Sequence, residues 1–191
     1  MTEVPKASPS VWNGPNVLTA LRVVMVPVFG WLLLSEGGAD TTYRFAALAV
    51  FLLAALTDRF DGELARRYNL VTDFGKIADP LADKALMGMA LVGLSVLGEL
   101  PWWVTAVVLV RELGITLLRF LVIRSQVIAA SRGGKAKTVL QTVAITLYLL
   151  PYDGPVRIVA MVVMAAAVVV TVVTGVDYLW KVLRSRRSRS A

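Results

Sequence analysis

Long apolar stretches, separated by short polar segments, constrain this chain more than any other feature of its sequence. A helix needs about 20 mainly apolar residues to cross the hydrocarbon core of a bilayer. Within that core each backbone polar group needs a partner in the protein, so helices are the expected spanning element. We therefore predict an all-α, polytopic membrane protein with six transmembrane helices. The predicted spans are 16–34, 43–66, 77–97, 102–123, 138–150 and 156–180.

The polar ends of the chain define its predicted organisation. Residues 1–15 contain three prolines, Pro5, Pro9 and Pro15, and are expected to form a flexible N-terminal tail. Residues 16–183 are expected to form one six-helix transmembrane catalytic domain. Residues 184–191 are rich in arginine, and we expect them to form a basic tail that binds anionic lipid.

The composition excludes several classes of site. The chain has no Cys and no His, which excludes a disulfide framework, a thiolate metal site and a Ser-His-Asp triad. Its formal net charge is +7. In a chain that is 57% hydrophobic, we assign this charge to the cytoplasmic membrane surface and not to nucleic acid.

The basic residues also predict the orientation. If the N terminus is cytoplasmic and six spans alternate, almost all of the 20 Lys and Arg residues fall at cytoplasmic ends, Arg22 among them. The exceptions are Arg44 and Arg157 on the outer side and Arg111 within the fourth span. Because cytoplasmic loops carry the excess of Lys and Arg, we predict that both termini are inside. This places the segment between the second and third spans at the cytoplasmic interface.

Four aspartates flank that segment and give the clearest sign of chemistry. Asp58 and Asp61 are three residues apart and Asp79 and Asp83 are four apart, so each pair lies on one face of its helix. Carboxylates beside hydrocarbon are unfavourable without a function. Oxygen-only ligands suit a hard divalent cation such as Mg²⁺ or Mn²⁺. With Arg66 nearby to bind phosphate, the set has the parts that phosphoryl transfer needs.

Structural interpretations compete with this one. The aspartates could be solvated helix ends, or partners of Arg59, Arg66 and Lys84. Arg111 and Glu112 could form a structural pair in the fourth span, and Lys135 and Lys137 could be charges of a basic loop over 125–137. We expect the Val-rich part of the sixth span, 159–173, to be packing or lipid-facing surface.

The eight-residue pattern Asp-x2-Asp-Gly-x2-Ala-Arg-x8-Gly-x3-Asp-x3-Asp resembles the signature of the CDP-alcohol phosphatidyltransferase family. It runs without departure through Asp58, Asp61, Gly62, Ala65, Arg66, Gly75, Asp79 and Asp83. The stretches 15–22, 73–84, 110–119 and 134–141 are similar to one branch, the bacterial phosphatidylglycerophosphate synthases.

The resemblance implies transfer of a phosphatidyl group from CDP-diacylglycerol to sn-glycerol 3-phosphate, giving phosphatidylglycerol phosphate and CMP. It implies two ions, Mg²⁺ or Mn²⁺, held by Asp58, Asp61, Asp79 and Asp83. It also implies that Asp83 is the base and that the active site faces the cytoplasm from the cell membrane. The residues implied for the CDP-lipid site are Asn16, Thr19, Gly62, Ala65, Arg66, Thr72 and Gly75. A homodimer is also expected.

A dianionic acceptor needs a second cationic cluster, for which we select Arg111, Arg119, Lys135 and Lys137. Three alternatives stay open at this point. A cardiolipin synthase or an inositol-phosphate-using synthase would share the signature. An ion-coupled or proton-coupled transporter could use the aspartates as a relay, although the six spans show no visible repeat. A non-catalytic scaffold would not account for the aspartate spacing.

Overall fold

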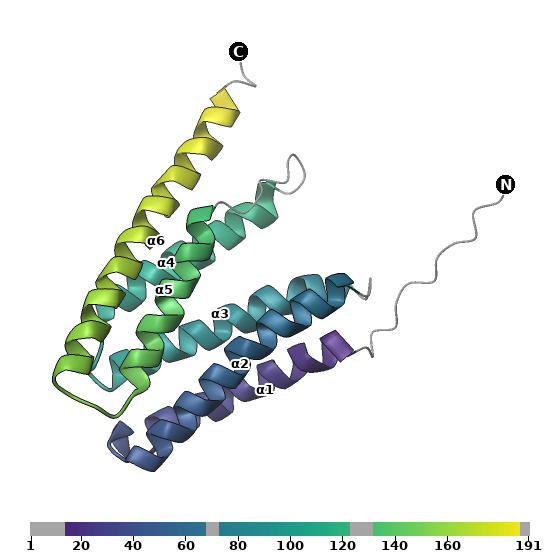
Figure 1. Ribbon diagram of the computed structural model, residues 1–191. Coiled ribbons are helices and arrows are strands. Elements are labelled where there is room, and N and C mark those ends of the chain that lie inside the picture. Colours follow the sequence, from purple (N-terminus) through teal and green to yellow (C-terminus); the bar gives the residue numbers. More distant parts are fainter. Residues whose placement is uncertain (1–13, 68–72, 123–131, 188–191) are drawn as a thin grey trace. The chain divides into compact units, whose positions relative to one another are not determined.

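The computed structural model describes residues 14–67, 73–122 and 132–187 of the chain, with side chains for 17–57, 80–117 and 136–180. Within these ranges it consists of helices and contains no strand (Figure 1), which confirms the all-α prediction for this part. Two segments, Val17–Gly38 and Pro155–Trp180, are long and apolar enough to cross a membrane. The six-span arrangement and its orientation stay predictions.

The chain divides into two compact units, Met1–Ala90 and Leu91–Ala191. The first contains α1 (Gly14–Leu34), the 3₁₀ turn η1 (Ser35–Gly38), α2 (Thr41–Arg67) and most of α3 (Asp73–Val96). The second contains the end of α3, then α4 (Trp102–Val122), α5 (Arg132–Leu149) and α6 (Pro155–Arg187).

In the first unit, α1 and α2 pack as an antiparallel hairpin (Figure 1) along buried positions that recur every three or four residues. Phe29 and Phe51 meet at its centre with ring centroids 5.7 Å apart. Ala47 and Ala54 flank Phe51, and such small residues let two helices approach closely in a membrane. We call the set of these positions the α1–α2 seam. It comprises Thr19, Arg22, Val26, Phe29 and Leu33 on α1 and Arg44, Ala47, Phe51 and Ala54 on α2.

The start of α2 differs from the prediction of residue 43. Asp40 precedes the helix, and its Oδ1 accepts hydrogen bonds from the backbone N–H groups of Thr42 (2.8 Å) and Tyr43 (3.0 Å). This N-cap supplies acceptors that the first helical turn otherwise lacks, so the helix begins at Thr41. The hydrophobic pattern begins later than the cap, which is why sequence periodicity placed the start too late.

In the second unit, α6 packs extensively on α5 and also contacts α4. The buried stripe of α6 again follows steps of four, three and four residues, through Ala160, Met164, Ala167 and Thr171. The opposing α5 contributes Ile145 and Leu149, neither of which is exposed. These stripes orient the polar residues that follow them on α6.

The junction between α3 and α4 is fixed by backbone and hydroxyl hydrogen bonds. The Glu99 N–H donates to the Leu94 carbonyl (3.0 Å) and the Gly98 N–H to the Ser95 carbonyl (3.1 Å), with Gly98 at φ 72°. This is the Schellman helix ending, in which glycine takes the left-handed conformation without a steric penalty. The buried hydroxyl oxygens of Ser95 and Thr105 are 2.7 Å apart and join the two helices.

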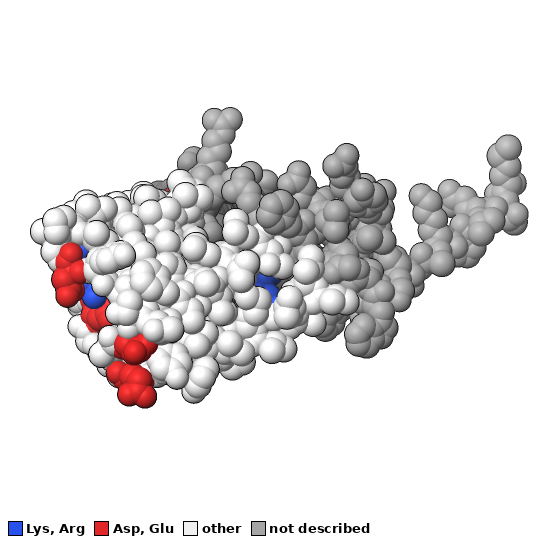
Figure 2. Space-filling view, turned by 60° about the horizontal axis from the view of Figure 1, so that its bottom comes forward, with Lys and Arg blue, Asp and Glu red and all other residues white. Residues whose placement is uncertain are grey.

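The described surface is poor in charge and rich in large apolar side chains. On the face that Figure 2 shows, most of the described residues are white, which marks residues that are neither acidic nor basic, and most of the acidic ones gather at one end. Exposed apolar residues occur in both units, for example Val24 (59% exposed) on α1 and Val162 (63%) on α6. A soluble protein rarely exposes so much contiguous apolar surface, whereas a lipid-facing helix requires it.

Three further helix ends differ from prediction. α3 begins at Asp73 and not near residue 77, so Asp79 and Asp83 lie deeper in the helix than its first turns. The first residue of α3, Asp73, is acidic, and a carboxylate in the first turn of a helix interacts favourably with the helix dipole. α5 begins at Arg132, so Lys135 and Lys137 lie on a helix and not in the predicted loop. α6 continues to Arg187, into the predicted basic tail.

Candidate active site

The structure places each predicted aspartate pair within one helix. Asp58 and Asp61 lie on α2, and Asp79 and Asp83 lie on α3. The Asp83 side chain is half-buried and takes part in a polar or electrostatic interaction. The side chains of the other three aspartates lie outside the described part of the structure. Their convergence on one site therefore stays a prediction.

The residue types of these two helix segments fit a hard divalent cation. Each helix carries two carboxylates about one turn apart, and neither has a His or Cys that would favour a softer metal. Among the residues with described side chains, no group of three or more acidic residues gathers to hold a metal. This does not test the predicted cage, because three of its four aspartates are not among those residues.

The residues predicted for the CDP-lipid site fall on three helices, with one exception. Thr19 on α1 is buried and 1% exposed, and it takes part in a polar interaction. Asn16 lies on α1 with an undescribed side chain. Gly62, Ala65 and Arg66 follow Asp61 on α2, and Gly75 lies near the start of α3. Thr72 lies outside the described residues.

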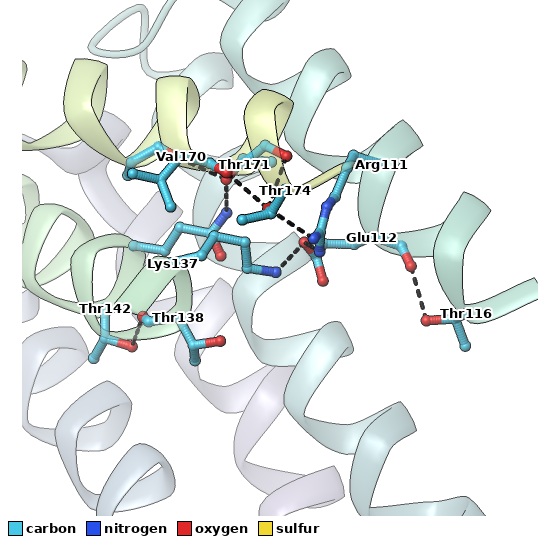
Figure 3. A network of polar contacts seen from close by, with 11 residues as sticks. Arg111, Glu112, Thr116, Lys137, Thr138, Thr142, Val170, Thr171 and Thr174 are labelled. Carbon is cyan, nitrogen blue, oxygen red and sulfur yellow. Dashed lines mark hydrogen bonds and ion pairs between the residues drawn. The ribbon is translucent and has the colours of Figure 1, made fainter. Parts of the chain in front are cut away.

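In the second unit, two of the four predicted acceptor residues meet at one carboxylate (Figure 3). Arg111 Nη1 donates to Glu112 Oε1 at 2.9 Å, and Lys137 Nζ donates to the same oxygen. The side chains of Arg111, Glu112 and Lys137 are only 17%, 18% and 6% exposed. Two cations thus share one carboxylate in a mostly desolvated setting. Such a cluster is suited to bind an anionic ligand.

Helix α6 completes this arrangement, which we call the Glu112 cluster (Arg111, Glu112, Lys137 and Thr174). Arg111 Nη2 donates to Thr174 Oγ1 at 3.0 Å, as Figure 3 shows. A Cβ placed on Gly175 would lie 3.1 Å from Arg111 Cγ, so the glycine makes room for the arginine stem. The buried Nε of Arg111 has no hydrogen-bond partner among the described residues.

The sequence pointed to Arg111 and Lys137 as acceptor candidates and to Arg111 with Glu112 as a structural pair, and the pair is present. It did not point to Thr174 or Gly175, and the acceptor role of the two cations stays a prediction. Thr174 and Gly175 lie just beyond the part of the sixth span that was expected to be only packing or lipid-facing surface. A threonine and a glycine after a run of valines are the only signal, and neither indicates a partner 63 residues away. The side chains of Arg119 on α4 and Lys135 on α5 are outside the described set.

A separate groove lies in the first unit. It has a volume of about 540 Å³ and is lined by Pro27, Gly30, Trp31, Leu34, Ser35 and Met89. The described residues of its lining are mainly apolar, and none of them is ionisable. The groove lies toward the C-terminal end of α1, away from Thr19.

Comparison with known proteins supports the resemblance noted in the sequence. The family model described as CDP-alcohol phosphatidyltransferase matches residues 12–173. A protein of Mycobacterium tuberculosis named probable phosphatidylglycerophosphate synthase is 57% identical over 172 residues, covering 90% of this chain and 82% of the relative.

Two more distant relatives have names that state the reaction. Proteins of Bacillus subtilis and Shigella flexneri, each named CDP-diacylglycerol--glycerol-3-phosphate 3-phosphatidyltransferase, are 34% and 37% identical. The first alignment covers 92% of this chain and 99% of the relative, and the second covers 88% and 93%. The similarity therefore extends over nearly the whole length of each protein.

Proposed function

Because this chain belongs to the CDP-alcohol phosphatidyltransferase family, we propose that it is the enzyme that makes phosphatidylglycerol phosphate. It transfers the phosphatidyl group of CDP-diacylglycerol to sn-glycerol 3-phosphate and releases CMP, in phospholipid biosynthesis. The observation that carries the proposal is the 57% identity, over 90% of this chain, to a relative named for that product. The eight-residue signature alone would equally fit an acceptor such as phosphatidylglycerol or inositol phosphate.

On the donor side, Asp58, Asp61, Asp79 and Asp83 would hold two divalent ions. Members of the family generally depend on such a metal. When bound, the ions neutralise charge on the diphosphate and on the departing CMP. Arg66 holds a phosphate oxygen, while Gly62, Ala65 and Gly75 leave space for the nucleotide to approach the helices. Asn16, Thr19 and Thr72 complete the CDP-lipid site.

Asp83 acts as the base in this proposal. It accepts the proton of the acceptor hydroxyl as that oxygen bonds to the β-phosphorus of CDP-diacylglycerol. The bond from the β-phosphorus to the bridging oxygen breaks, and CMP leaves with the electron pair. A carboxylate suits this role because the rest of the chemistry is positioning and charge stabilisation.

On the acceptor side, Arg111 and Lys137 bind the phosphate of glycerol 3-phosphate, assisted by Arg119 and Lys135. The shared contact with Glu112 supports this assignment, since it holds two cations from different helices in one partly buried place. Charge-assisted hydrogen bonds of this type are stronger than neutral ones. Glu112 contributes by fixing both donors before the substrate arrives.

The same proposal includes topology and assembly. The chain crosses the cell membrane six times with both termini inside, and its active site faces the cytoplasm, because nearly all Lys and Arg residues fall on that side. Residues 16–183 form the catalytic domain between tails 1–15 and 184–191, and two chains form a homodimer. Lipid acyl chains remain in the bilayer while the charged headgroups react at its surface.

CMP release from the purified protein in detergent tests this function. CDP-diacylglycerol and Mg²⁺ are supplied with glycerol 3-phosphate, phosphatidylglycerol or inositol phosphate in separate reactions. We expect release with glycerol 3-phosphate alone, its loss in EDTA, its return with Mg²⁺ or Mn²⁺, and no turnover by folded Asp83→Asn protein. Release with another acceptor would overturn the substrate assignment. No release with any of them, from folded protein, would favour the transporter.

A further inference from the structure

Arg22 is a charged residue in the core of the first unit to which the proposed reaction assigns no role. It is 0% exposed and is the largest fully buried side chain in the described part of the chain. Its guanidinium is always charged, and an isolated buried charge is strongly unfavourable. Arg22 does take part in a polar or electrostatic interaction. We therefore expect a compensating acidic group close to its guanidinium.

The α1–α2 seam indicates where that partner lies. The contact between Phe29 and Phe51 fixes the register of the two helices. Because they are antiparallel, a step back along α1 corresponds to an equal step forward along α2. By this rule Leu33 corresponds to Ala47 and Val26 to Ala54, and all four of these residues are buried.

The next step along the seam reaches the aspartate signature. Seven residues, or about two turns, before Phe29 is Arg22, and seven residues after Phe51 is Asp58. α2 stays helical to Arg67, so the register continues through this position. One step further, Thr19 corresponds to Asp61. The same register therefore continues from the buried positions of α2 to Asp58 and Asp61.

The other described acidic residues of this unit are poorer candidates. Glu36 lies in η1 and Asp40 at the start of α2, both at the opposite end of the hairpin. Fourteen residues separate Arg22 from Glu36, which corresponds to about 20 Å along a helix. Asp83 lies on α3 and is half-buried. Among the signature aspartates, Asp58 and Asp61 lie on α2, the helix that pairs with α1 along the seam.

We propose that Arg22 is the buried counter-charge of the aspartate cluster and that it positions Asp58. Its guanidinium holds one carboxylate oxygen and so presents the other to the metal ion. Outer partners of this kind orient metal ligands in many proteins. The inference rests on the proposed function only in assigning Asp58 to the metal. Arg22 itself does not touch the reacting atoms.

A double-mutant cycle in metal-free protein tests the pairing. Arg22→Met, Asp58→Asn and the double variant are purified in detergent with EDTA, and their apparent Tm values are compared. Removing one partner leaves the other uncompensated, so we expect each single variant to melt lower. The loss in the double variant should be smaller than the sum of the single losses by about 4 °C or more.

Arg44→Met is the matched control. Arg44 is also buried (3% exposed) on the same seam, but 14 residues from Asp58 on α2. The loss in Tm that Arg44→Met causes should add to the loss that Asp58→Asn causes. Additive losses for Arg22 as well would overturn the proposal. If Arg22→Met alone does not fold, rescue of folding by Asp58→Asn supports the pairing, and failure of rescue overturns it.

Mg²⁺ titration tests whether Arg22 orients Asp58 toward the ion or only compensates its charge. The rise in Tm with Mg²⁺ gives the midpoint for each variant without any measurement of turnover. For Arg22→Met we expect a midpoint about tenfold higher or more, with Arg44→Met unchanged. A lower or equal midpoint would mean that Arg22 competes with the ion or is irrelevant to it. Because no substrate is present, a wild type that releases no CMP would refute the proposed function and leave this result intact.

Discussion

Two ion-pair clusters in the second unit use the same residue types with different charge balance. Arg157 Nη2 donates to Glu99 Oε2 at 2.9 Å, and its guanidinium lies 5.0 Å from the centre of the Tyr148 ring. That cluster has one cation for one anion. In the Glu112 cluster, two cations share one carboxylate. A pair of one cation and one anion joins two elements, whereas a carboxylate shared by two cations gathers donors where an anionic ligand can bind.

Among the substitutions that test this difference, we expect the one at Lys137 to have the largest effect on the KM for glycerol 3-phosphate. Lys137→Gln removes a buried ammonium, and a charge-assisted hydrogen bond contributes about 1.5–3 kcal/mol. We expect the KM for glycerol 3-phosphate to rise at least about tenfold, with the KM for CDP-diacylglycerol nearly unchanged. Steady-state kinetics on both substrates measure this. An unchanged acceptor KM for both Lys137→Gln and Arg111→Gln would show that these two cations have no role in binding the acceptor.

Disruption of the Arg157–Glu99 pair should lower the stability of the protein and leave its kinetics unchanged. Glu99→Gln leaves Arg157 without its anion in a site where the two side chains are only 18% and 25% exposed. We expect a loss of about 1–2 kcal/mol, visible as a Tm lower by roughly 3–8 °C. Both KM values should stay as in the wild type. A specific rise in the acceptor KM would remove the distinction between the two clusters.

A third prediction uses two glycines that differ in surroundings. Gly175→Ala places a Cβ about 3.1 Å from Arg111 Cγ, whereas Gly114 on α4 has nothing within 4 Å of its own Cβ position. Alanine at 175 should displace the arginine and raise the acceptor KM a few-fold, on the order of 1 kcal/mol. Gly114→Ala should leave kinetics unchanged and stabilise α4 slightly. Equal behaviour of the two variants would contradict the close packing of Arg111 on α6.

The smallest effect is expected at Thr174. Thr174→Val keeps the shape of the side chain but removes the hydroxyl that accepts the 3.0 Å bond from Arg111. Arg111 keeps its bond to Glu112, so the acceptor KM should rise only about two-fold to five-fold, for a neutral acceptor contributing roughly 0.5–1 kcal/mol. A rise as large as that of Lys137→Gln would mean that Thr174, and not Glu112, fixes the arginine.

Local patterns predicted the positions of several helices, whereas the roles of the candidate site residues stay predictions. Helices 102–123 and 16–34 were placed within two residues of the observed α4 and α1, because their apolar runs coincide with the helices. Residues 132–137 were assigned to a loop because they are basic and contain two glycines, yet they form the start of α5. Lys and Ala favour a helix once its remainder packs on α6.

Arg22 is a residue whose burial could not be predicted from the sequence. In the sequence it resembles the other basic residues at cytoplasmic ends, and it contributed to the charge count that predicted orientation. Its complete burial depends on its place in the seam, opposite a second helix. A single residue does not reveal which face of its helix meets a neighbour when the whole helix is apolar.

The sequence by itself determined the helical class, the family and the aspartate pairs, because these depend on hydropathy and on spacings within one helix. Only the tertiary structure decided that Glu112 gathers Arg111 and Lys137 from two helices, and that Thr174 and Gly175 of a third helix support the arginine. The reason is physical. Contacts between helices depend on how their faces pack, and residues up to 63 positions apart meet only after that packing is complete.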